Sequence, residues 1–260
     1  MKVKYEDHPK LDPETKIPSN GNTKIWRYMD FTKFVSLLQR KALFFCRSDR
    51  LGDSFEGSFS KANVENRNKE TYVDLSEVYR AMTRFTIVNC WNISDYESAS
   101  LWSLYAKAKQ GIAIQSTVDR LKQCFGSEEE PFPQRASIRG VFIGRVKYID
   151  YKIEKIPEGY FLAPFLHKRK SFEHENELRA IIMKFPGNKQ DFIDLNEWST
   201  APDVFWDGEY VNIDVQTLVE KVYVLPMSPD WFRLLVNDIM RKYGLRKKAL
   251  KSNLDESPVY

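Results

Sequence analysis

The sequence has few of the residues that mark secreted, metal-binding and membrane-spanning proteins. Its three cysteines, Cys46, Cys90 and Cys124, lie far apart, form no Cys-x-x-Cys pair and have no histidine at metal-ligand spacing. Such spacing indicates neither a disulfide framework nor a zinc site. No run approaches the roughly 18 apolar residues of a transmembrane helix, and Met1 to Asn22 lacks the apolar segment of a secretory signal peptide. We therefore expect a cytoplasmic protein with no membrane partner.

A surplus of charge of one sign is also lacking. The chain has 40 Lys and Arg against 36 Asp and Glu, a formal net charge of +4 over 260 residues. This surplus does not indicate a dedicated nucleic-acid-binding protein. What the chain does have is a 42% hydrophobic and 14% aromatic share, which supports a sizeable core and excludes disorder, collagen or coiled coil as a description of the whole chain.

Strand and helix patterns alternate along the chain without an internal repeat. Apolar runs predict strands, and apolar residues three and four apart predict helices. Strands are expected at 25–28, 42–46, 85–91, 111–115, 141–151, 178–183 and 219–225, and helices at 31–38, within 61–84, at 97–105, 118–125 and 160–167, and after Pro229. In the last helix, Trp231, Leu234, Leu235 and Ile239 are spaced for one buried face.

This alternation predicts an α+β fold with a mixed or split sheet of about seven strands flanked by helices. No linker long enough to separate domains is present, so residues 24–250 are expected to form a single domain. Residues 1–23 are expected to be a surface leader, because prolines and turn-forming residues dominate them, and residues 251–260 a tail.

An arginine stands inside the first predicted strand, between Trp26 and Tyr28. Because side chains alternate along a strand, Arg27 is expected to point away from these two rings, toward solvent or a cavity. An exposed arginine at the edge of a sheet is the structural interpretation, and a ligand contact is the functional one.

A second polar cluster follows the next predicted strand, from Arg47 to Gly57. We expect Phe55 to anchor this loop in the core. The loop is typical of a self-paired turn in which Asp53 caps and Glu56 completes a capping box. It is equally typical of the border of a pocket for an anionic or ribose-containing ligand, since arginine binds phosphate and carboxylates accept hydroxyl hydrogen bonds.

A third cluster lies on the predicted helix 97–105. Ser98, Trp102 and Tyr105 are four and three residues apart, which places them on one helix face, where the two rings would form a stacking wall. Core packing is the favoured interpretation for Trp102, while the hydroxyls make Ser98 and Tyr105 better candidates for a pocket.

The fourth cluster holds the strongest candidates for chemistry. Glu173, Glu175 and Glu177 alternate and would project to one side of an extended segment, followed by Arg179. Like charges on one face repel each other unless they pair with cations or bind a ligand. In the structural interpretation, the basic run 168–170 neutralises the glutamates and the segment is a solvated, charged edge. A glutamate that enters a hydrophobic strand is also typical of a catalytic carboxylate with a raised pKa.

Taken in order, these motifs resemble the bacterial family catalogued as domain of unknown function 2971. The resemblance covers most of residues 24–254. It rests on Trp26-Arg27-Tyr28, on Asp53-x-Phe55-Glu56-Gly57, on Cys90-Trp91 with Glu97-Ser98-x-x-x-Trp102-x-x-Tyr105 and Gly111, and on Phe172-x-x-Glu175-x-Glu177-x-Arg179.

The opening unit is also similar to the start of the ADP-ribosyltransferase superfamily. The similarity lies in the strand arginine, the Phe-x-x-Leu-Leu pattern of 34–38 and Ala42-Leu43-Phe44-Phe45, although the chain has no Ser-Thr-Ser strand motif. It implies that NAD is the substrate, that Arg27 contacts it, and that Glu177 or Glu175 orients the nicotinamide ribose. The remaining residues implied to bind NAD are Tyr28, Asp53, Glu56, Ser98, Trp102, Tyr105 and Arg179.

Three functions remain open at this point. The resemblance implies an NAD-dependent ADP-ribosyltransferase or NAD-hydrolysing effector in bacterial defence or toxicity, with an acceptor that the sequence does not identify. The second function is a non-enzymatic module that senses a nucleotide or binds a protein. The third is a metal-dependent nuclease that uses Asp53, Glu56, Glu175 and Glu177.

Overall fold

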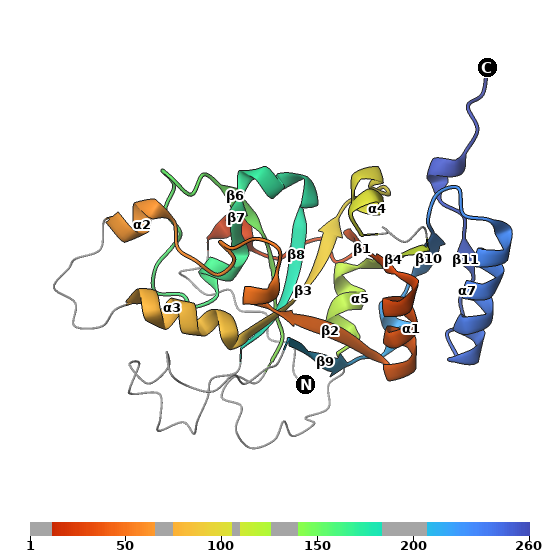
Figure 1. Cartoon of the computed structure of the whole chain (residues 1–260), viewed down its shortest axis with the longest axis horizontal. Helices are drawn as coiled ribbons and strands as arrows, with labels where there is room; N and C mark the ends of the chain where they lie inside the picture. The colour runs from red at the N-terminus through yellow and green to blue at the C-terminus, as the bar shows by residue number, and fades with distance from the viewer. Residues whose placement is uncertain (1–11, 66–74, 106–109, 126–139, 184–206) are drawn as a thin grey trace. The chain divides into compact units, whose positions relative to one another are not determined.

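The computed structural model describes residues 12–65, 75–105, 110–125, 140–183 and 207–260 (Figure 1). The strands are β1 (Lys24–Asp30), β2 (Ala42–Arg47), β3 (Thr86–Ile93), β4 (Gly111–Thr117), β5 (Phe142–Arg145), β6 (Lys147–Ile149), β7 (His167–Arg169), β8 (Glu177–Met183), β9 (Gly208–Asn212), β10 (Lys221–Val224) and β11 (Ala249–Leu250). The α-helices are α1 (Phe31–Arg40), α2 (Lys61–Glu65), α3 (Leu75–Arg84), α4 (Ala99–Tyr105), α5 (Val118–Gln123), α6 (Val215–Leu218) and α7 (Asp230–Lys242).

The fold is α+β, as the sequence predicts. Within the described ranges, nine strands form one mostly antiparallel sheet with the order β11-β10-β4-β1-β3-β2-β9, and β8 pairs with both β3 and β5. The strands β6 and β7 form a separate parallel pair. The sheet has more strands than the seven expected, because β11 has only two residues and β9 has only two apolar residues, Tyr210 and Val211, so neither gives a recognisable pattern.

The chain folds into two compact units. Unit 1 draws on Met1–Ile17, Phe44–Cys90 and Ser127–Tyr210, and unit 2 draws on Pro18–Leu43, Trp91–Gly126 and Val211–Tyr260. The expected single domain over residues 24–250 stays a prediction.

Unit 1 is built on β8, whose seven residues are all buried. Its neighbour β5 pairs antiparallel to it, with Gly144 opposite Arg179. The apolar part of β8 packs against α3 and the 3-10 helix Ala163–Leu166. The core that they form includes Phe85, Phe165 and Ile181. The chain before residue 18 takes part as well, since Thr15 is buried and the Asp12 carboxylate accepts a hydrogen bond from Lys147 Nζ at 3.0 Å.

Unit 2 is built on β4, which lies between β1 and β10. Register places Tyr28 opposite Ala113 on β4, and Ala113 opposite Tyr223 on β10. Large aromatic side chains fill the core here, with Trp26 stacked on Tyr28 and 5.2 Å from the ring of Tyr223. Asp30 ends β1 and caps α1 by accepting from the Lys33 N–H at 2.8 Å.

Two expectations about helices are wrong. Residues 160–167 form only the short 3-10 helix Ala163–Leu166, which ends as the chain enters β7. In α7 the buried residues are Phe232, Val236 and Met240, whereas Trp231 is 58% exposed. Leu234 and Leu235 are exposed too. The helix has apolar residues on more than one face, so spacing alone did not identify the face that meets the sheet.

None of the helices in the described ranges is long and apolar enough to cross a membrane.

Candidate functional site

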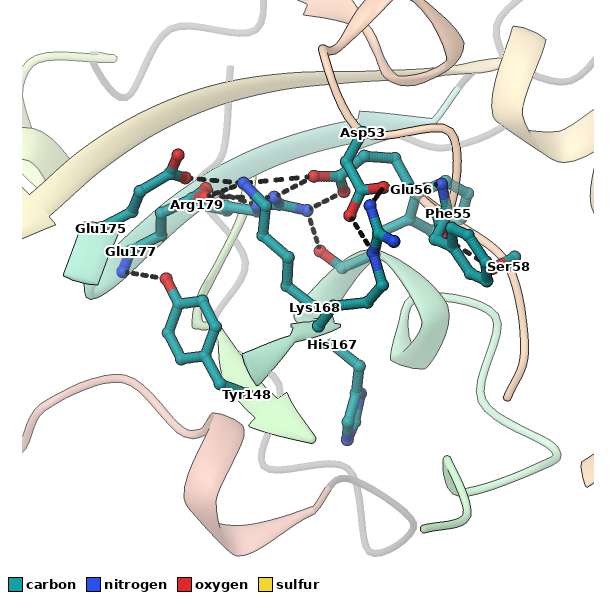
Figure 2. Close-up of polar contacts among 12 residues, drawn as sticks. Asp53, Phe55, Glu56, Ser58, Tyr148, His167, Lys168, Glu175, Glu177 and Arg179 are labelled. Carbon is teal, nitrogen blue, oxygen red and sulfur yellow. Dashed lines mark hydrogen bonds and ion pairs between the residues drawn. The ribbon is translucent and has the colours of Figure 1, made fainter. Parts of the chain in front are cut away.

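The most unusual feature of unit 1 is a set of charged side chains at the start of β8 (Figure 2). Glu177 and Arg179 are two residues apart and therefore share a face of the strand. Arg179 is 1% exposed and Glu177 is 4% exposed. A charge buried this deeply is tolerated only where partners neutralise it and satisfy its hydrogen bonds.

Arg179 is fully satisfied by two carboxylates and a carbonyl. Its Nη1 and Nη2 donate to the two oxygens of Glu56 at 2.7 and 2.8 Å, a bidentate pair. Its Nε donates to Glu177 Oε2 at 2.8 Å, and Nη1 also donates to the backbone oxygen of Phe165 at 2.9 Å. Arg179 thus links the loop that carries Glu56 to Glu177, the first residue of β8.

Lys168, from β7, supplies the second buried cation. Its Nζ donates to Glu175 Oε2 at 2.6 Å and to Glu177 Oε1 at 2.7 Å, and lies 3.5 Å from Glu56 Oε1. The partner strand β6 contributes Tyr148, whose hydroxyl oxygen accepts a hydrogen bond from the Glu177 N–H at 2.9 Å. The position of Glu177 is therefore fixed through both its side chain and its backbone.

The charges of this cluster balance without Glu175. Lys168 and Arg179 carry two positive charges, and Glu56 and Glu177 carry two negative ones. Burial and the hydrogen bond that Glu175 shares with Glu177 raise the pKa of Glu175 to about 7. Burial opposes ionisation of Glu177 as well, but the charge of Arg179 and the hydrogen bond from Glu175 hold its pKa well below the usual value. Glu175 is thus the carboxyl of the pair that carries a proton near neutral pH.

The backbone between the two glutamates is not the extended segment that the sequence suggested. Lys170–Glu175 form a 3-10 helix, and Asn176 follows in the left-handed conformation with φ of 36°. This turn leaves Glu173 exposed in solvent and brings Glu175 to Glu177. Local hydrogen bonding of the helix overrides the strand alternation on which the prediction relied.

A cation and two aromatic rings lie on the outer side of the cluster. Arg169 donates to both carboxylate oxygens of Asp53, at 2.6 and 3.2 Å. Its guanidinium lies 4.4 Å from the ring centre of Phe55 and 5.4 Å from that of Phe172. The expectation that Phe55 anchors the loop in the core is wrong, because its ring is 41% exposed.

The loop that bears Asp53 has the predicted cap but not the complete capping box. Asp53 Oδ1 accepts a hydrogen bond from the Phe55 N–H at 3.0 Å, which closes the turn. The Glu56 side chain binds Arg179 instead of returning to the backbone of the cap. The buried guanidinium is the stronger partner, because both groups are charged.

Unit 2 contains three of the predicted site residues, Arg27, Tyr28 and Ser98, and each contacts another residue of the unit. Arg27 is half-buried, and its guanidinium lies 5.9 Å from the ring centre of Trp91. The Tyr28 hydroxyl accepts a hydrogen bond from the Ser98 N–H at 2.7 Å. Ser98 caps α4 by accepting from the Leu101 N–H at 3.3 Å.

The stacking wall expected on α4 does not form. Trp102 is 2% exposed, and its ring meets the edge of Tyr28 at 5.0 Å in the core. Tyr105 is 49% exposed, so the two rings do not share a face. The indole Nε1 of Trp102 donates to Glu97 Oε2 at 3.0 Å, which satisfies its one polar atom. Core packing, the interpretation favoured for Trp102, agrees with this burial.

The ten predicted site residues fall into two groups. Unit 1 brings together Asp53, Glu56, Glu175, Glu177 and Arg179, and unit 2 contains Arg27, Tyr28, Ser98, Trp102 and Tyr105. Sequence reasoning did not include Lys168, Arg169 or Tyr148 among the site residues. The basic run directly before the acidic one was the signal for the two cations, and it was interpreted as a solvated edge.

No group of three or more His, Cys, Asp or Glu side chains that could hold a metal ion occurs within the part of the chain that the structure describes. The carboxylates Glu56 and Glu177 bind Arg179 and Lys168 instead.

A scan against protein-family models, a search of curated proteins and a search of solved structures all find no match to this chain. The resemblance to domain of unknown function 2971 stays a prediction from the motifs.

Proposed function

We propose that unit 1 carries an acid–base site centred on Glu175, and that this site serves an NAD-consuming transferase or glycohydrolase. The observation that carries the proposal is the carboxyl pair: Glu175 has a pKa of about 7 and hydrogen-bonds to Glu177, which Arg179 and Lys168 keep ionised. A group whose pKa lies near the operating pH is suited to moving protons in catalysis. The choice of NAD comes from the sequence resemblance.

In the proposed reaction, Glu175 acts as the general base. The bond between C1′ of the ribose and the nicotinamide nitrogen breaks, and nicotinamide leaves with the bonding electron pair. A bond forms between C1′ and the oxygen of water or of an acceptor, whose proton passes to the Glu175 carboxylate. Glu177 acts as a positioning residue, because it is buried and its oxygens already bind Lys168 and Arg179.

Recognition of the nucleotide would use the outer side of the cluster. The exposed ring of Phe55 offers a surface on which a base can stack, and Arg169 beside it carries a positive charge that favours phosphate. The side chain of Arg169 is 37% exposed, so it is within reach of a ligand from solvent. The role of Arg27 at the pyrophosphate stays a prediction from the resemblance.

Nicotinamide release from NAD by the full chain tests the proposal. We expect the wild type to release nicotinamide, at a rate that rises as the pH passes through about 7 and Glu175 loses its proton. Glu175→Gln should lower the rate by about 10²- to 10⁴-fold, the usual contribution of a general base. The matched control is Glu173→Gln, since Glu173 is exposed and two residues away. A wild type that leaves NAD intact, or a Glu175→Gln variant as active as the wild type, would refute the proposal.

A non-enzymatic module is the second candidate, and the completeness of the ion pairs favours it. The side chains of Arg179, Glu56 and Glu177 are each at most 5% exposed, as expected of a structural cluster. This candidate predicts that NAD or a related nucleotide raises the melting temperature without being consumed. Thermal melts with and without NAD, followed by analysis of the nucleotide, distinguish it from the enzyme.

A further inference from the structure

Unit 2 contains a hollow of about 640 Å³ beside the end of α7 whose lining is strongly basic. Five of its lining side chains are cations: Arg233, Arg241, Arg246, Lys247 and Lys248. None of the described residues that line it carries a carboxylate. The volume lies within the range of about 300–1,000 Å³ that is common for small-ligand sites.

The walls of the hollow are held in place by the backbone. Arg233, Asn237 and Arg241 are four residues apart, so they lie along one face of α7. The chain that follows the helix returns alongside it, since the Leu245 N–H donates to the Met240 oxygen at 2.8 Å and the Ala249 N–H donates to Asn237 Oδ1 at 2.8 Å. Residues 246–248 are thereby fixed between two anchored points.

Local carboxylates account for only part of this charge. Asp230 lies 3.4 Å from Arg233, and Asp238 pairs with Arg241. Among the residues that the structure describes, no ion pair joins a carboxylate to Arg246, Lys247 or Lys248.

Nor does the helix dipole explain the whole set. The dipole favours cations in the last turn of a helix, which covers Arg241, but residues 246–248 lie beyond that turn. The Nε of Arg233 is also buried without a hydrogen-bond partner in the described part of the chain. A buried donor of this kind is normally satisfied by protein, water or ligand.

We propose that this hollow binds an oligophosphate group, meaning two or more linked phosphates of a nucleotide or of polyphosphate. Arginine forms bidentate hydrogen bonds to phosphate, and lysine adds charge. Several cations around one hollow repel each other, and a multiply charged anion relieves that repulsion better than a single phosphate. The hollow suits a compact ligand rather than an extended nucleic acid, because the chain as a whole carries a net charge of only +4. The proposal is independent of the site at Glu175.

Calorimetric titration of the full chain with tripolyphosphate tests the proposal, and the variants below separate binding in the hollow from binding of phosphate to Arg169 at the Glu175 site. We expect tripolyphosphate to bind at least tenfold more tightly than orthophosphate at the same ionic strength. The double variant Lys247→Ala/Lys248→Ala should weaken binding at least tenfold. The control Lys33→Ala/Lys221→Ala removes the same charge elsewhere in unit 2 and should bind as the wild type does.

Thermal melts of both double variants check that they fold, and loss of binding by a folded Lys247→Ala/Lys248→Ala supports the site. If this variant does not fold, Arg246→Gln replaces it in the same titration and should weaken binding as well. Equal loss in the control, or no preference over orthophosphate, would overturn the proposal. Binding of a single-stranded 12-nucleotide DNA without binding of tripolyphosphate would overturn it too, in favour of a nucleic-acid surface.

Discussion

The protonation of Glu175 depends on charges that come from three separate segments. Glu56 is more than 100 residues before the other charged residues, Lys168 lies on β7 and Glu177 with Arg179 lies on β8, and their charges cancel where they meet. Glu175 shares Lys168 with Glu56 and Glu177, and burial together with the hydrogen bond to Glu177 outweighs the attraction of that lysine, so the carboxyl keeps its proton to about pH 7. The same residue in an exposed loop would ionise near its ordinary pKa, as carboxyls in water do.

The energetic importance of the buried ion pairs is testable at Arg179. Arg179→Met removes the partner of two buried carboxylates and should lower the free energy of unfolding by about 3–5 kcal/mol. Glu56→Gln should cost less in that background than in the wild type, with a coupling energy above about 1 kcal/mol. Urea unfolding of the two single variants and the double variant measures both quantities.

The control for this cycle is Arg50→Met, whose guanidinium lies 3.6 Å from Asp207 in an exposed pair. We expect a cost of about 0–1 kcal/mol there. Strictly additive effects of Glu56→Gln and Arg179→Met would show that the two side chains do not stabilise each other.

At the scale of elements, the junction between the 3-10 helix Lys170–Glu175 and β8 decides the geometry of the carboxyl pair. Asn176 joins the two elements at a φ of 36°, and its Oδ1 accepts a hydrogen bond from Arg145 Nη2 at 3.2 Å. Asparagine adopts this left-handed conformation more readily than most residues, whereas β-branched residues avoid it. The pairing of Glu175 with Glu177 therefore depends on a residue that carries no charge.

Substitution of Asn176 tests this dependence. Asn176→Val should destabilise the protein by about 1–3 kcal/mol, because valine is strained at this φ. It should also lower the pKa of Glu175 toward its ordinary value, since the carboxyl no longer meets Glu177. Asn176→Gly is the control, because glycine adopts positive φ freely and should keep the raised pKa. NMR titration of the Glu175 carboxyl carbon measures the pKa, and an unshifted value in the valine variant would refute the idea.

For the whole molecule, some carboxyl groups have lowered pKa values and Glu175 has a raised one, which predicts that stability is highest on the acidic side of neutral pH. Against the raising effect of burial, hydrogen bonds and cations hold the pKa values of Asp12, Asp30 and Glu177 below their usual range. Their stabilisation is present above the pKa of the unfolded chain, near 4, and is lost as the pH falls. The raised pKa of Glu175 acts in the opposite direction, and its stabilisation is lost as the pH rises from about 4.5 through 7.

Stability should therefore be highest near pH 5 and fall toward pH 8. The glutamine of the Glu175→Gln variant cannot ionise, so the loss of stability between pH 5 and pH 8 should disappear. After allowance for solvent screening, we expect this variant to be more stable than the wild type at pH 8 by about 1 kcal/mol. Unfolding in urea at pH 3, 5 and 8 measures the profile. A wild type equally stable at pH 5 and 8 would contradict the expected balance.

The fold class and the position of most elements could be predicted from the amino-acid sequence alone. Apolar runs such as Ala180–Met183 and Gly111–Ile114 are buried in β8 and β4, because a strand buried on both faces favours that composition. The cluster of glutamates ahead of β8 was also identified from its charge pattern. These features could be predicted because the spacing of apolar residues and the density of charge are properties of a few adjacent residues.

Local sequence patterns did not predict which faces and charges meet in the folded chain. The buried face of α7 runs through Phe232 rather than Trp231, and Tyr105 is 49% exposed whereas Trp102 lies in the core, as the favoured sequence interpretation of Trp102 expected. Likewise, Lys168 is a buried partner of Glu177 and not part of a solvated edge. These outcomes depend on contacts between segments distant in sequence, and the energy of a buried charge depends on all the charges around it.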